Sequence, residues 1–214
     1  MRHEADRDGP RSRRHLILDA AIEQFGELGF EYTKWADIAD QAGIGETGLY
    51  HYFESKAHCL LSIMSSELDR SWQRFLQATA NQEDHSERLR LAVASAFDVT
   101  PREALSARIL LNHLNLLSTK RRLESEEEER RRSRAVVRKI EDAWATLIMD
   151  GIGAGVFAER DPRQTALAIL GLILSVWRWY RPSGDFTLDE VSEFIAESCA
   201  RLVDPRLFEA VAGN

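Results

Sequence analysis

The sequence predicts an all-α protein, and three observations support that prediction. Apolar residues recur at three- and four-residue spacing along most of the chain, which is the period of a helix with one buried face. No stretch of useful length shows the alternation of a half-buried strand. Signals for the start of a helix recur instead, each a pair of residues that fits the capping-box pattern: Asp84 with Glu87, Thr100 with Glu103, Asp161 with Gln164, and Thr187 with Glu190.

The N-terminal part is expected to hold a polar, mobile arm, residues 1–10, and three helices in residues 11–56. The first helix begins near Ser12, and its inner face carries Ile17, Ala21, Phe25 and Leu28. Gly29 ends this helix, because glycine takes the left-handed conformation there without strain. Two short helices follow over residues 34–42 and 46–53, around Gly43 and Gly45. This arrangement predicts a helix-turn-helix DNA-binding domain.

The rest of the chain, residues 57–214, is expected to form a larger helical domain. A long helix begins at Ser55 and runs through residue 75, and about five more helices follow, for about nine in total. Pro101 and Pro162 fit the first position of two of them, where a missing N–H has no partner to lose. Residues 166–177 are apolar nearly all round, so this segment needs apolar neighbours on more than one side.

One charged run, residues 126–134 (EEEERRRSR), has the pattern of a solvated helix face. Its acidic and basic residues lie four apart, which favours ion pairs along one helix: Glu126 with Arg130, Glu127 with Arg131 and Glu128 with Arg132. Contacts of these arginines with nucleic acid are the alternative. The neighbouring acids would repel phosphate, so we expect the solvated face.

Composition and charge exclude several classes of protein. The formal charge of −7 at pH 7 excludes a protein that coats nucleic acid through bulk positive charge, so any contact with DNA has to be local. Cys59 and Cys199 lack the spacing of a zinc site, which predicts free thiols and no bound metal or cofactor. The polar N-terminus has no secretory signal and residues 166–177 are too few to cross a bilayer, which predicts a cytoplasmic protein without membrane contact.

The second short helix of the helix-turn-helix has the two faces that a DNA-reading helix needs. Helical stepping from Leu49 places Phe53 beside it, facing inward, whereas Thr47 and His51 point away from the core. Tyr50 and Gly48 flank them, so the outward face is small and polar and suits the major groove. The alternative is an ordinary helical hairpin whose aromatic residues lie at the surface.

Lys56 supports the DNA-binding interpretation. It lies in the first helical turn after Ser55, the expected N-cap, where the helix dipole disfavours a cation. A DNA phosphate beside the Lys56 ammonium, the Tyr50 hydroxyl and the free amides of this helix end would explain the position.

Residues 17–64 resemble the N-terminal DNA-binding region of TetR-type repressors. The matching motifs include Ala20-Ala21 with Phe25, Gly29-Phe30, Ile38-Ala39, Ala42-Gly43 and the run LYHYF followed by Ser55-Lys56. The resemblance implies phosphate contacts for Thr33, Tyr50, His51 and Lys56 and places Trp35, Glu46, Thr47 and Gly48 near the bases; Lys34 is included in the predicted DNA-binding set. Glycine at positions 45 and 48 and the acid Glu46 depart from the family pattern, and the role of Glu46 stays open.

The same resemblance implies a dimer built from the late helices. Two such helices from each subunit would form a four-helix bundle, and its two-fold symmetry would match a palindromic operator. The residues expected at this interface are Trp144, Ile148, Leu167, Leu170 and Leu174.

Residues 177–184 (WRWYRPSG) resemble a segment of the TetR-type branch that represses fatty-acid or sterol-fragment catabolism and is released by acyl-CoA thioesters. Arginines among aromatic residues could pair with CoA phosphates and stack on adenine, which nominates Trp177, Arg178, Trp179 and Arg181 as ligand-binding residues. The alternative is that the cations complement a helix dipole and the tryptophans pack in the core. Asn112, His113 and Asn115 interrupt an apolar run and are the other candidate ligand residues, although the pattern favours a satisfied core histidine over a ligand contact for His113.

We therefore expect a ligand-responsive repressor that binds double-stranded operator DNA as a homodimer and responds to a small molecule, with an acyl-CoA thioester favoured. A TetR-type regulator of efflux that responds to a drug-like ligand is the alternative. An enzyme is disfavoured, since no nucleophile elbow, phosphate loop, metal-ligand spacing or carboxylate pair is present. A helical interaction protein that has lost DNA binding is the third possibility, suggested by Glu46 and the acidic N-terminal half.

Overall fold

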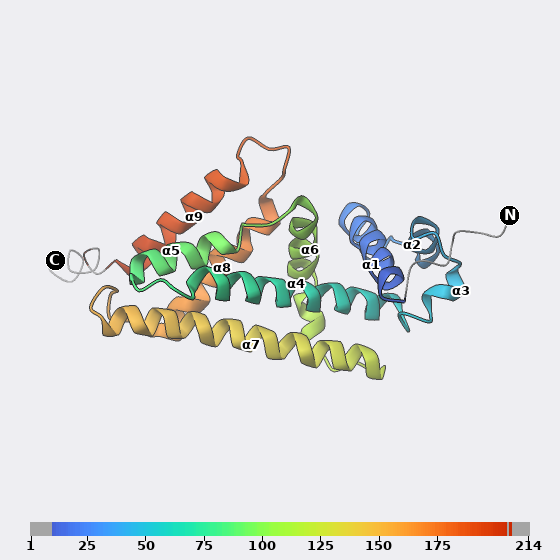
Figure 1. Ribbon diagram of the computed structural model, residues 1–214, viewed down its shortest axis with the longest axis horizontal. Helices are drawn as coiled ribbons and strands as arrows, with labels where there is room; N and C mark the ends of the chain where they lie inside the picture. The colour runs from blue at the N-terminus through green and yellow to red at the C-terminus, as the bar shows by residue number, and fades with distance from the viewer. Residues whose placement is uncertain (1–9, 205, 207–214) are drawn as a thin grey trace. The chain divides into compact units, whose positions relative to one another are not determined.

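The computed structural model describes residues 10–204 and residue 206, and within that part all regular structure is helical, which confirms the all-α prediction (Figure 1). Most of the predicted arm, residues 1–9, lies outside the described residues. The nine α-helices and one 3₁₀ helix found there are α1 (Pro10–Glu27), α2 (Trp35–Gln41), α3 (Glu46–Leu49), α4 (Lys56–Thr79), α5 (His85–Ser95), α6 (Pro101–Asn112), η1 (Leu114–Leu117), α7 (Glu124–Gly153), α8 (Pro162–Trp179) and α9 (Leu188–Val203).

The chain divides into two compact units, with borders inside α4 and α7 and at the start of α6. Unit 1 comprises residues 1–67 and 102–133, and unit 2 comprises residues 68–101 and 134–214. Unit 1 therefore contains α1, α2, α3, α6 and the first parts of α4 and α7. The sequence-based border at residues 56 and 57 stays a prediction, since the structural units divide the chain along other lines.

Helix starts follow the predicted side-chain caps. Asp84 and Asp161 each accept a hydrogen bond from the backbone N–H three residues ahead, and Pro162 follows at the first helical position. Thr187 and Glu190 form a complete capping box at the start of α9. Each cap satisfies N–H groups that have no partner inside the helix, so the sequence fixes these boundaries locally.

At the end of α1, the predicted conformation of Gly29 is confirmed and the predicted burial of Leu28 is wrong. Gly29 has a φ of +87°, the left-handed conformation expected at a helix end. Leu28, expected on the inner face, is 53% exposed, so that part of the prediction is wrong. The helix ends at Glu27, and beyond that point helical stepping no longer determines the direction of a side chain.

The core of unit 1 forms where α1 packs on α2 and α2 on α3. Ile17, Ala21, Ile38, Leu49 and Phe53 are buried there. Helix α6 approaches the end of α1 closely, since a Cβ added at Gly26 would lie 3.1 Å from a methyl group of Leu105. Helices α2 and α3, predicted to read DNA, thus share unit 1 with α6.

The core of unit 2 is largely aromatic and aliphatic. Helix α9 packs on both α5 and α8. The Phe75 ring of α4 lies 5.3 Å from that of Trp144 in α7, and Phe97 lies 5.9 Å from Trp177 of α8. Apolar burial of this kind is the main source of folding free energy in such a unit.

The charged run at the start of α7 is solvated on one side only, where Glu128, Arg131, Arg132 and Arg134 are exposed as predicted. Glu126 and Glu127 are only 5% and 8% exposed, and Ser133 is fully buried. Of the three predicted i,i+4 pairs, Glu127 with Arg131 is observed at 2.9 Å, while Glu126 pairs with Arg121 instead. The local pattern gave the wrong environment for Glu126, because its partners Ser55 and Arg121 lie outside the charged run.

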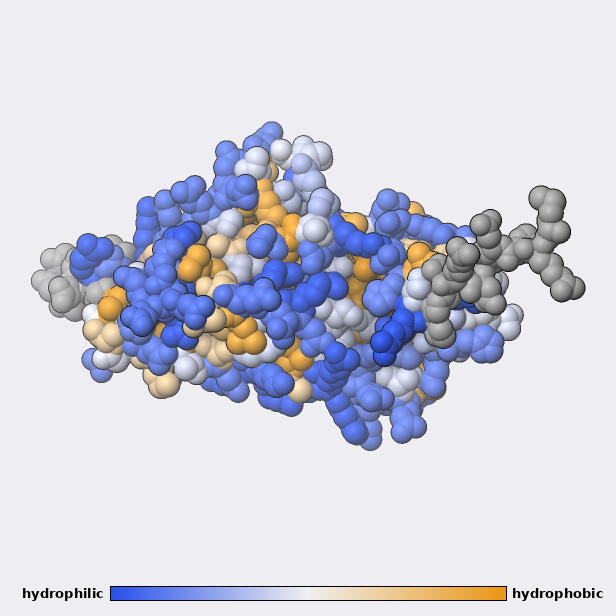
Figure 2. Space-filling view, viewed as in Figure 1, coloured by the Kyte–Doolittle hydropathy of each residue, from blue (hydrophilic) through white to orange (hydrophobic). Residues whose placement is uncertain are grey.

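The face of the molecule in Figure 2 is mostly hydrophilic and shows separate hydrophobic patches. Among residues 10–204, no helix is both long and apolar enough to cross a membrane. In the same part of the chain, no group of three or more His, Cys, Asp or Glu side chains is arranged to hold a metal ion.

Candidate DNA interface and effector residues

The predicted reading helix, α3, is shorter than expected. Its regular part covers only Glu46–Leu49, whereas the sequence predicts a helix over residues 46–53. Residues 50–53 continue as tight turns, in which the Tyr52 N–H donates to the Leu49 carbonyl at 2.9 Å. Gly45 provides no side-chain cap, and glycines at positions 45 and 48 lower helix propensity, which accounts for the short helix.

The face that α3 turns away from the core carries the predicted DNA contacts. Thr47 and His51 are exposed, and Tyr50 is 55% exposed. Leu49 and Phe53 are fully buried, as helical stepping predicts. The small polar face described from sequence is therefore present, and its contacts with bases and phosphates stay predictions.

Helix α2 adds two of the predicted DNA residues at its start. Lys34 is exposed at the N-cap position, and the Trp35 ring lies edge-on to the Tyr50 ring with centroids 6.4 Å apart. The Trp35 indole nitrogen is buried and has no hydrogen-bond partner within the described part of the chain. This contact joins the start of α2 to the turn after α3, so the two segments present one surface.

Lys56, which is predicted to contact a DNA phosphate, has partners within the protein. Its ammonium donates to the carbonyls of Phe30 at 2.7 Å and Thr33 at 2.8 Å, and it lies 4.4 Å from the centre of the Phe30 ring. These contacts explain a cation in the first turn of α4, where the helix dipole disfavours it. We call Lys56, Phe30 and Thr33 the loop clamp.

Thr33 completes the loop clamp from the other side. It is 2% exposed, and its hydroxyl donates to the Gly29 carbonyl at 2.8 Å and lies 3.1 Å from the Gln24 carbonyl. A hydroxyl held in this way fixes the path between α1 and α2. The predicted phosphate contact of Thr33 is untested by this geometry, but the side chain has a structural role that the sequence did not reveal.

A second cluster holds the start of α4 and was missed by the sequence interpretation. The Ser55 hydroxyl caps the helix by accepting from the His58 N–H, and it donates to Glu126 of α7 at 2.6 Å. Arg121 also pairs with Glu126, at 2.9 Å. A buried carboxylate with two partners therefore fixes the N-cap that lies next to Lys56.

Arg14 of α1 extends this cluster. It donates to the Ser62 hydroxyl at 3.1 Å and lies 4.7 Å from the centre of the Phe53 ring, and Ser62 donates to Glu129 of α7 at 3.1 Å. We call Arg14, Ser55, Ser62, Glu126 and Glu129 the α7 latch. No local sequence signal could identify it, since its hydroxyls and carboxylates are about 70 residues apart in the chain.

His58 lies beside the α7 latch. Burial lowers its pKa, and the nearby carboxylate of Glu129 opposes that shift. Its Nδ1 accepts from the Glu54 N–H at 3.2 Å, which requires the unprotonated nitrogen. The neutral imidazole is thus the form that fits this site.

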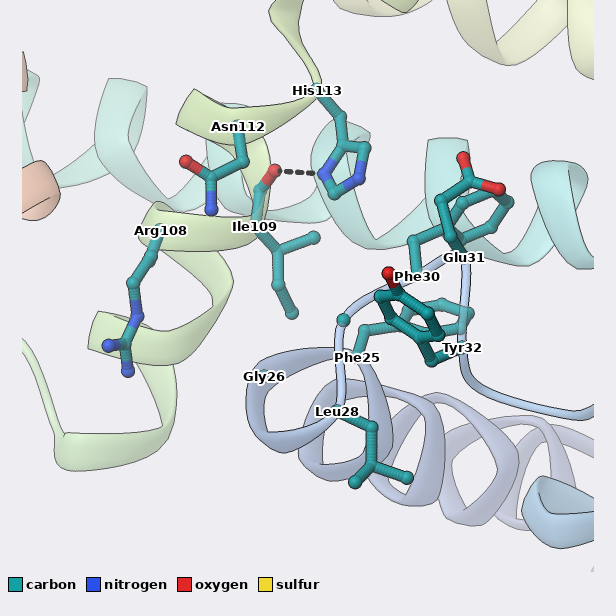
Figure 3. Close-up of a pocket in the computed structure, with 11 residues that line it drawn as sticks. Phe25, Gly26, Leu28, Phe30, Glu31, Tyr32, Arg108, Ile109, Asn112 and His113 are labelled. Atoms are coloured by element: carbon teal, nitrogen blue, oxygen red, sulfur yellow. Dashed lines mark hydrogen bonds between the residues drawn. The ribbon is translucent and has the colours of Figure 1, made fainter.

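Two of the predicted ligand residues line a pocket of about 250 Å³ within unit 1 (Figure 3). Asn112 and His113 lie at the end of α6 and face the loop between α1 and α2. The His113 Nδ1–H donates to the Ile109 carbonyl at 2.8 Å, and the imidazole lies edge-on to Phe30 at 5.7 Å. Asn115 lies on η1 and is exposed, outside the pocket lining.

The other predicted ligand residues belong to unit 2 and have mixed environments. Trp177 is buried against Phe97 and Tyr180, as in the core-packing alternative. Arg178 and Trp179 are exposed, so both are accessible. Arg181 is also exposed, and its guanidinium donates to the Tyr180 carbonyl at 2.9 Å near the end of α8.

Some of the residues expected at a dimer interface are buried within unit 2, and others are exposed or half-buried. Trp144 and Ile148 are 3% and 1% exposed inside unit 2, so they have no free area to offer a second subunit and are core residues. Leu167 is 45% exposed, and Leu170 and Leu174 are half-buried on α8. The interface prediction is therefore limited to the α8 residues.

Comparison with known protein families decides what this arrangement is. The family described as "Bacterial regulatory proteins, tetR family" matches residues 17–63, and "Tetracyclin repressor-like, C-terminal domain" matches residues 82–203. The second match covers more than half of the chain. The chain belongs to the TetR family. It is thus a DNA-binding transcriptional regulator and not an enzyme, and residues 17–63 of the TetR match include the loop clamp and the exposed face of α3.

Individual TetR-type relatives match over most of the chain. The HTH-type transcriptional repressor KstR2 of Rhodococcus jostii is 28% identical over 191 residues, which cover 88% of this chain and 89% of that protein. The TetR-family regulator PfmR of Thermus thermophilus has a TM-score of 0.75 at 25% identity, covering 86% of this chain and 97% of PfmR. AibR, solved with isovaleryl coenzyme A and operator DNA, has a TM-score of 0.72 at 24% identity, covering 90% and 98%, which shows a shared fold.

Proposed function

We propose that this TetR-family protein is a repressor that binds a palindromic operator as a homodimer and responds to an acyl-CoA thioester. The exposed face of Thr47, Tyr50 and His51 beside the loop clamp is the observation that supports operator binding most directly. Its surroundings are acidic overall, so this local surface has to supply the contacts that bulk charge does not. Such a regulator acts at the chromosome, in the cytoplasm.

The effector proposal rests on the relatives and on the accessible residues of unit 2. KstR2 is a transcriptional repressor, and AibR has been solved with isovaleryl coenzyme A. The exposed Arg178, Trp179 and Arg181 supply two cations and an aromatic surface, which suit the phosphates and adenine of coenzyme A. These relatives favour an acyl-CoA over the drug-like ligand of an efflux regulator.

The dimer proposal rests on the exposed apolar surface of α8 and α9. Leu167 and Leu172 of α8 are exposed, as is Phe194 of α9. Large apolar side chains exposed on two late helices favour a partner surface, and a second copy of the chain would remove them from water. The two copies of α3 in such a dimer would then face half-sites of the operator about 34–36 Å apart.

Selection of binding sites from random double-stranded DNA tests the operator proposal. We expect enrichment of an inverted repeat whose half-sites are about one helical turn apart. Footprinting on the selected sequence should then show release by at least one acyl-CoA in a chain-length series, with free coenzyme A as the control. Enrichment of no sequence would contradict DNA binding, and release only by drug-like compounds would contradict the effector.

Two substitutions test the docking surface in different ways. Lys34→Gln should flatten the dependence of log affinity on log salt concentration by about one unit, because one cation no longer contacts phosphate. Tyr50→Phe should weaken operator binding by about five- to tenfold without changing that slope, because it removes a neutral hydrogen bond. Lys139→Gln on α7 and Tyr180→Phe after α8, both in unit 2 and measured without effector, are the matched controls, and equal effects in control and test variants would overturn the docking surface.

A further inference from the structure

The pocket of unit 1 is the feature that the proposed function leaves unused (Figure 3). It lies between the end of α6 and the turn that follows α1, inside the same unit as the reading helices. Its volume of about 250 Å³ is far too small for a coenzyme A thioester but is sufficient for one aromatic ring with a short substituent.

One side of the pocket is a wall of rings. Phe25 and Phe30 lie edge to face with centroids 5.2 Å apart, and His113 meets Phe30 from α6 at 5.7 Å. Phe25 and Ile109 are buried at the pocket floor, while Tyr32 is exposed at its mouth. Rings set at these angles offer both faces and edges to a flat apolar body, which is the packing that aromatic pairs prefer.

The α6 side of the pocket is polar. The Asn112 amide makes no hydrogen bond within the described residues, and Arg108 lies one helical turn before it on the same lining. His113 uses Nδ1 for the Ile109 carbonyl, which leaves Nε2 for a ligand. An amide and a guanidinium together suit a carboxylate, whereas the Glu31 carboxylate in the lining disfavours a ligand with several negative charges.

We propose that this pocket binds a small aromatic monocarboxylate, as a site additional to that of the acyl-CoA effector. The ring lies against Phe30 and Ile109, and the carboxylate meets Asn112 and Arg108. A single negative charge on a flat apolar body matches both sides of the pocket, and neither a neutral aromatic compound nor a polyphosphate does.

Occupancy of this pocket reaches the DNA-binding surface through one residue. Phe30 forms the pocket wall, and its carbonyl and ring both hold the Lys56 ammonium of the loop clamp. A ligand packed against the Phe30 ring therefore changes the free energy of the loop clamp, and with it the affinity for operator. Linkage makes the effect reciprocal, so operator DNA changes the affinity for the carboxylate by the same factor.

The test uses the full-length protein and 4-fluorophenylacetate, followed by fluorine NMR. We expect saturable binding with a dissociation constant below about 1 mM, at least tenfold tighter than that of 4-fluorophenylethanol, the matched neutral probe. Asn112→Asp keeps the size of the side chain but places a negative charge beside the carboxylate, and it should weaken binding at least tenfold. Asn115→Asp, the same change on η1 outside the pocket, should alter binding less than twofold.

Further readouts separate this site from the effector site. Saturating acyl-CoA should leave the bound probe in place, and the probe should shift operator affinity in the wild type but not in Asn112→Asp. Absence of saturable binding, equal binding of the neutral probe, equal losses in both Asp variants, or displacement of the probe by acyl-CoA would each overturn the proposal. Operator binding without ligand is measured in the same samples, so failure of this site is distinguishable from failure of the proposed function.

Discussion

The first half of α7 buries carboxylates, whereas its second half buries an aromatic and aliphatic face. In unit 1, Glu126 and Glu129 accept hydrogen bonds from hydroxyls of the α3–α4 turn and α4. In unit 2, Trp144, Leu147 and Ile148 are almost fully buried, and Trp144 packs on Phe75 of the same α4 helix. One pair of helices thus uses two kinds of contact along its length.

Apolar burial and buried carboxylates contribute different properties to the two halves of α7. Apolar burial is non-directional and scales with area, so the second half of α7 contributes mainly stability. Buried carboxylates gain little net stability, since their desolvation offsets most of the attraction, but their hydrogen bonds allow few geometries. The polar half lies in the unit that carries α2 and α3, so we expect it to fix the orientation of α4 and thereby the predicted docking of α3 on DNA.

Replacing the central apolar residue of the second half should have the largest effect. Trp144→Ala removes a buried aromatic side chain and leaves a cavity beside Phe75, so we expect a loss of about 3–5 kcal/mol in the free energy of unfolding. Urea denaturation followed by circular dichroism measures it. Lys139→Ala, an exposed change on the same half, is the control, and equal effects would show that this face is not the core of unit 2.

Removing a carboxylate from the first half should cost less stability but more DNA affinity. Glu126→Ala leaves Ser55 and Arg121 without their buried partner, for a loss of about 1–3 kcal/mol. Operator affinity should fall several-fold, although Glu126 lies outside the predicted DNA-contacting set, because the N-cap of α4 loses its anchor. The adjacent exposed Glu128→Ala is the control for both measurements, and unchanged operator affinity in Glu126→Ala would remove the positioning role of the α7 latch.

The same half should make stability depend on acid pH. Hydrogen bonds from the Arg130 guanidinium, the Arg121 backbone N–H and Arg131 hold the pKa of Glu127 far below its usual range. A depressed folded-state pKa stabilises the protein above the unfolded-state value of about 4.3, and that stability is lost as the pH falls below it. Urea midpoints from pH 6 to pH 3 should therefore decline less steeply in Glu127→Gln than in wild type, while Glu128→Gln keeps the wild-type slope.

The smallest effect is expected at the junction of the two halves. Ser133 is fully buried, and its hydroxyl has no hydrogen-bond partner in the described part of the chain. Ser133→Ala removes an unsatisfied polar group at almost constant volume, so the protein should be unchanged or more stable by up to about 1 kcal/mol. A clear loss of stability in thermal melts would mean that the hydroxyl has a partner, and that the polar half of α7 extends past residue 133.

The fold was predictable where the information is local. Caps such as Asp84 and Asp161 act over three residues, and the inner face of α1 follows from helical stepping. The same reasoning was wrong at Leu28, which follows the end of α1, and it made α3 too long, although Phe53 is buried as stepping predicts. It also missed the burial of Glu126 and Glu127 within a run that is otherwise partly solvated, since a row of charges looks alike whether water or a hydroxyl from another helix faces it.

The candidate site was predictable to the same extent. The outward directions of Thr47 and His51 follow from their spacing to Leu49, and the structure has them exposed. The partners of Lys56 are carbonyl groups 26 and 23 residues away, and every residue has a carbonyl, so no side-chain pattern identifies them. The pocket beside Phe30 likewise depends on how α6 packs on the turn after α1, which is tertiary information.

The short α3 has a consequence for how this regulator can evolve. Of its four residues, only Leu49 is buried, so positions 46–48 can change without disturbing the core. On the predicted docking, in which these positions lie near the bases, mutations that alter operator preference would be nearly neutral for folding and could accumulate before selection acts on them. A duplicated copy could acquire a new set of target genes through three adjacent codons, while the buried Glu126 of α7 has to be kept.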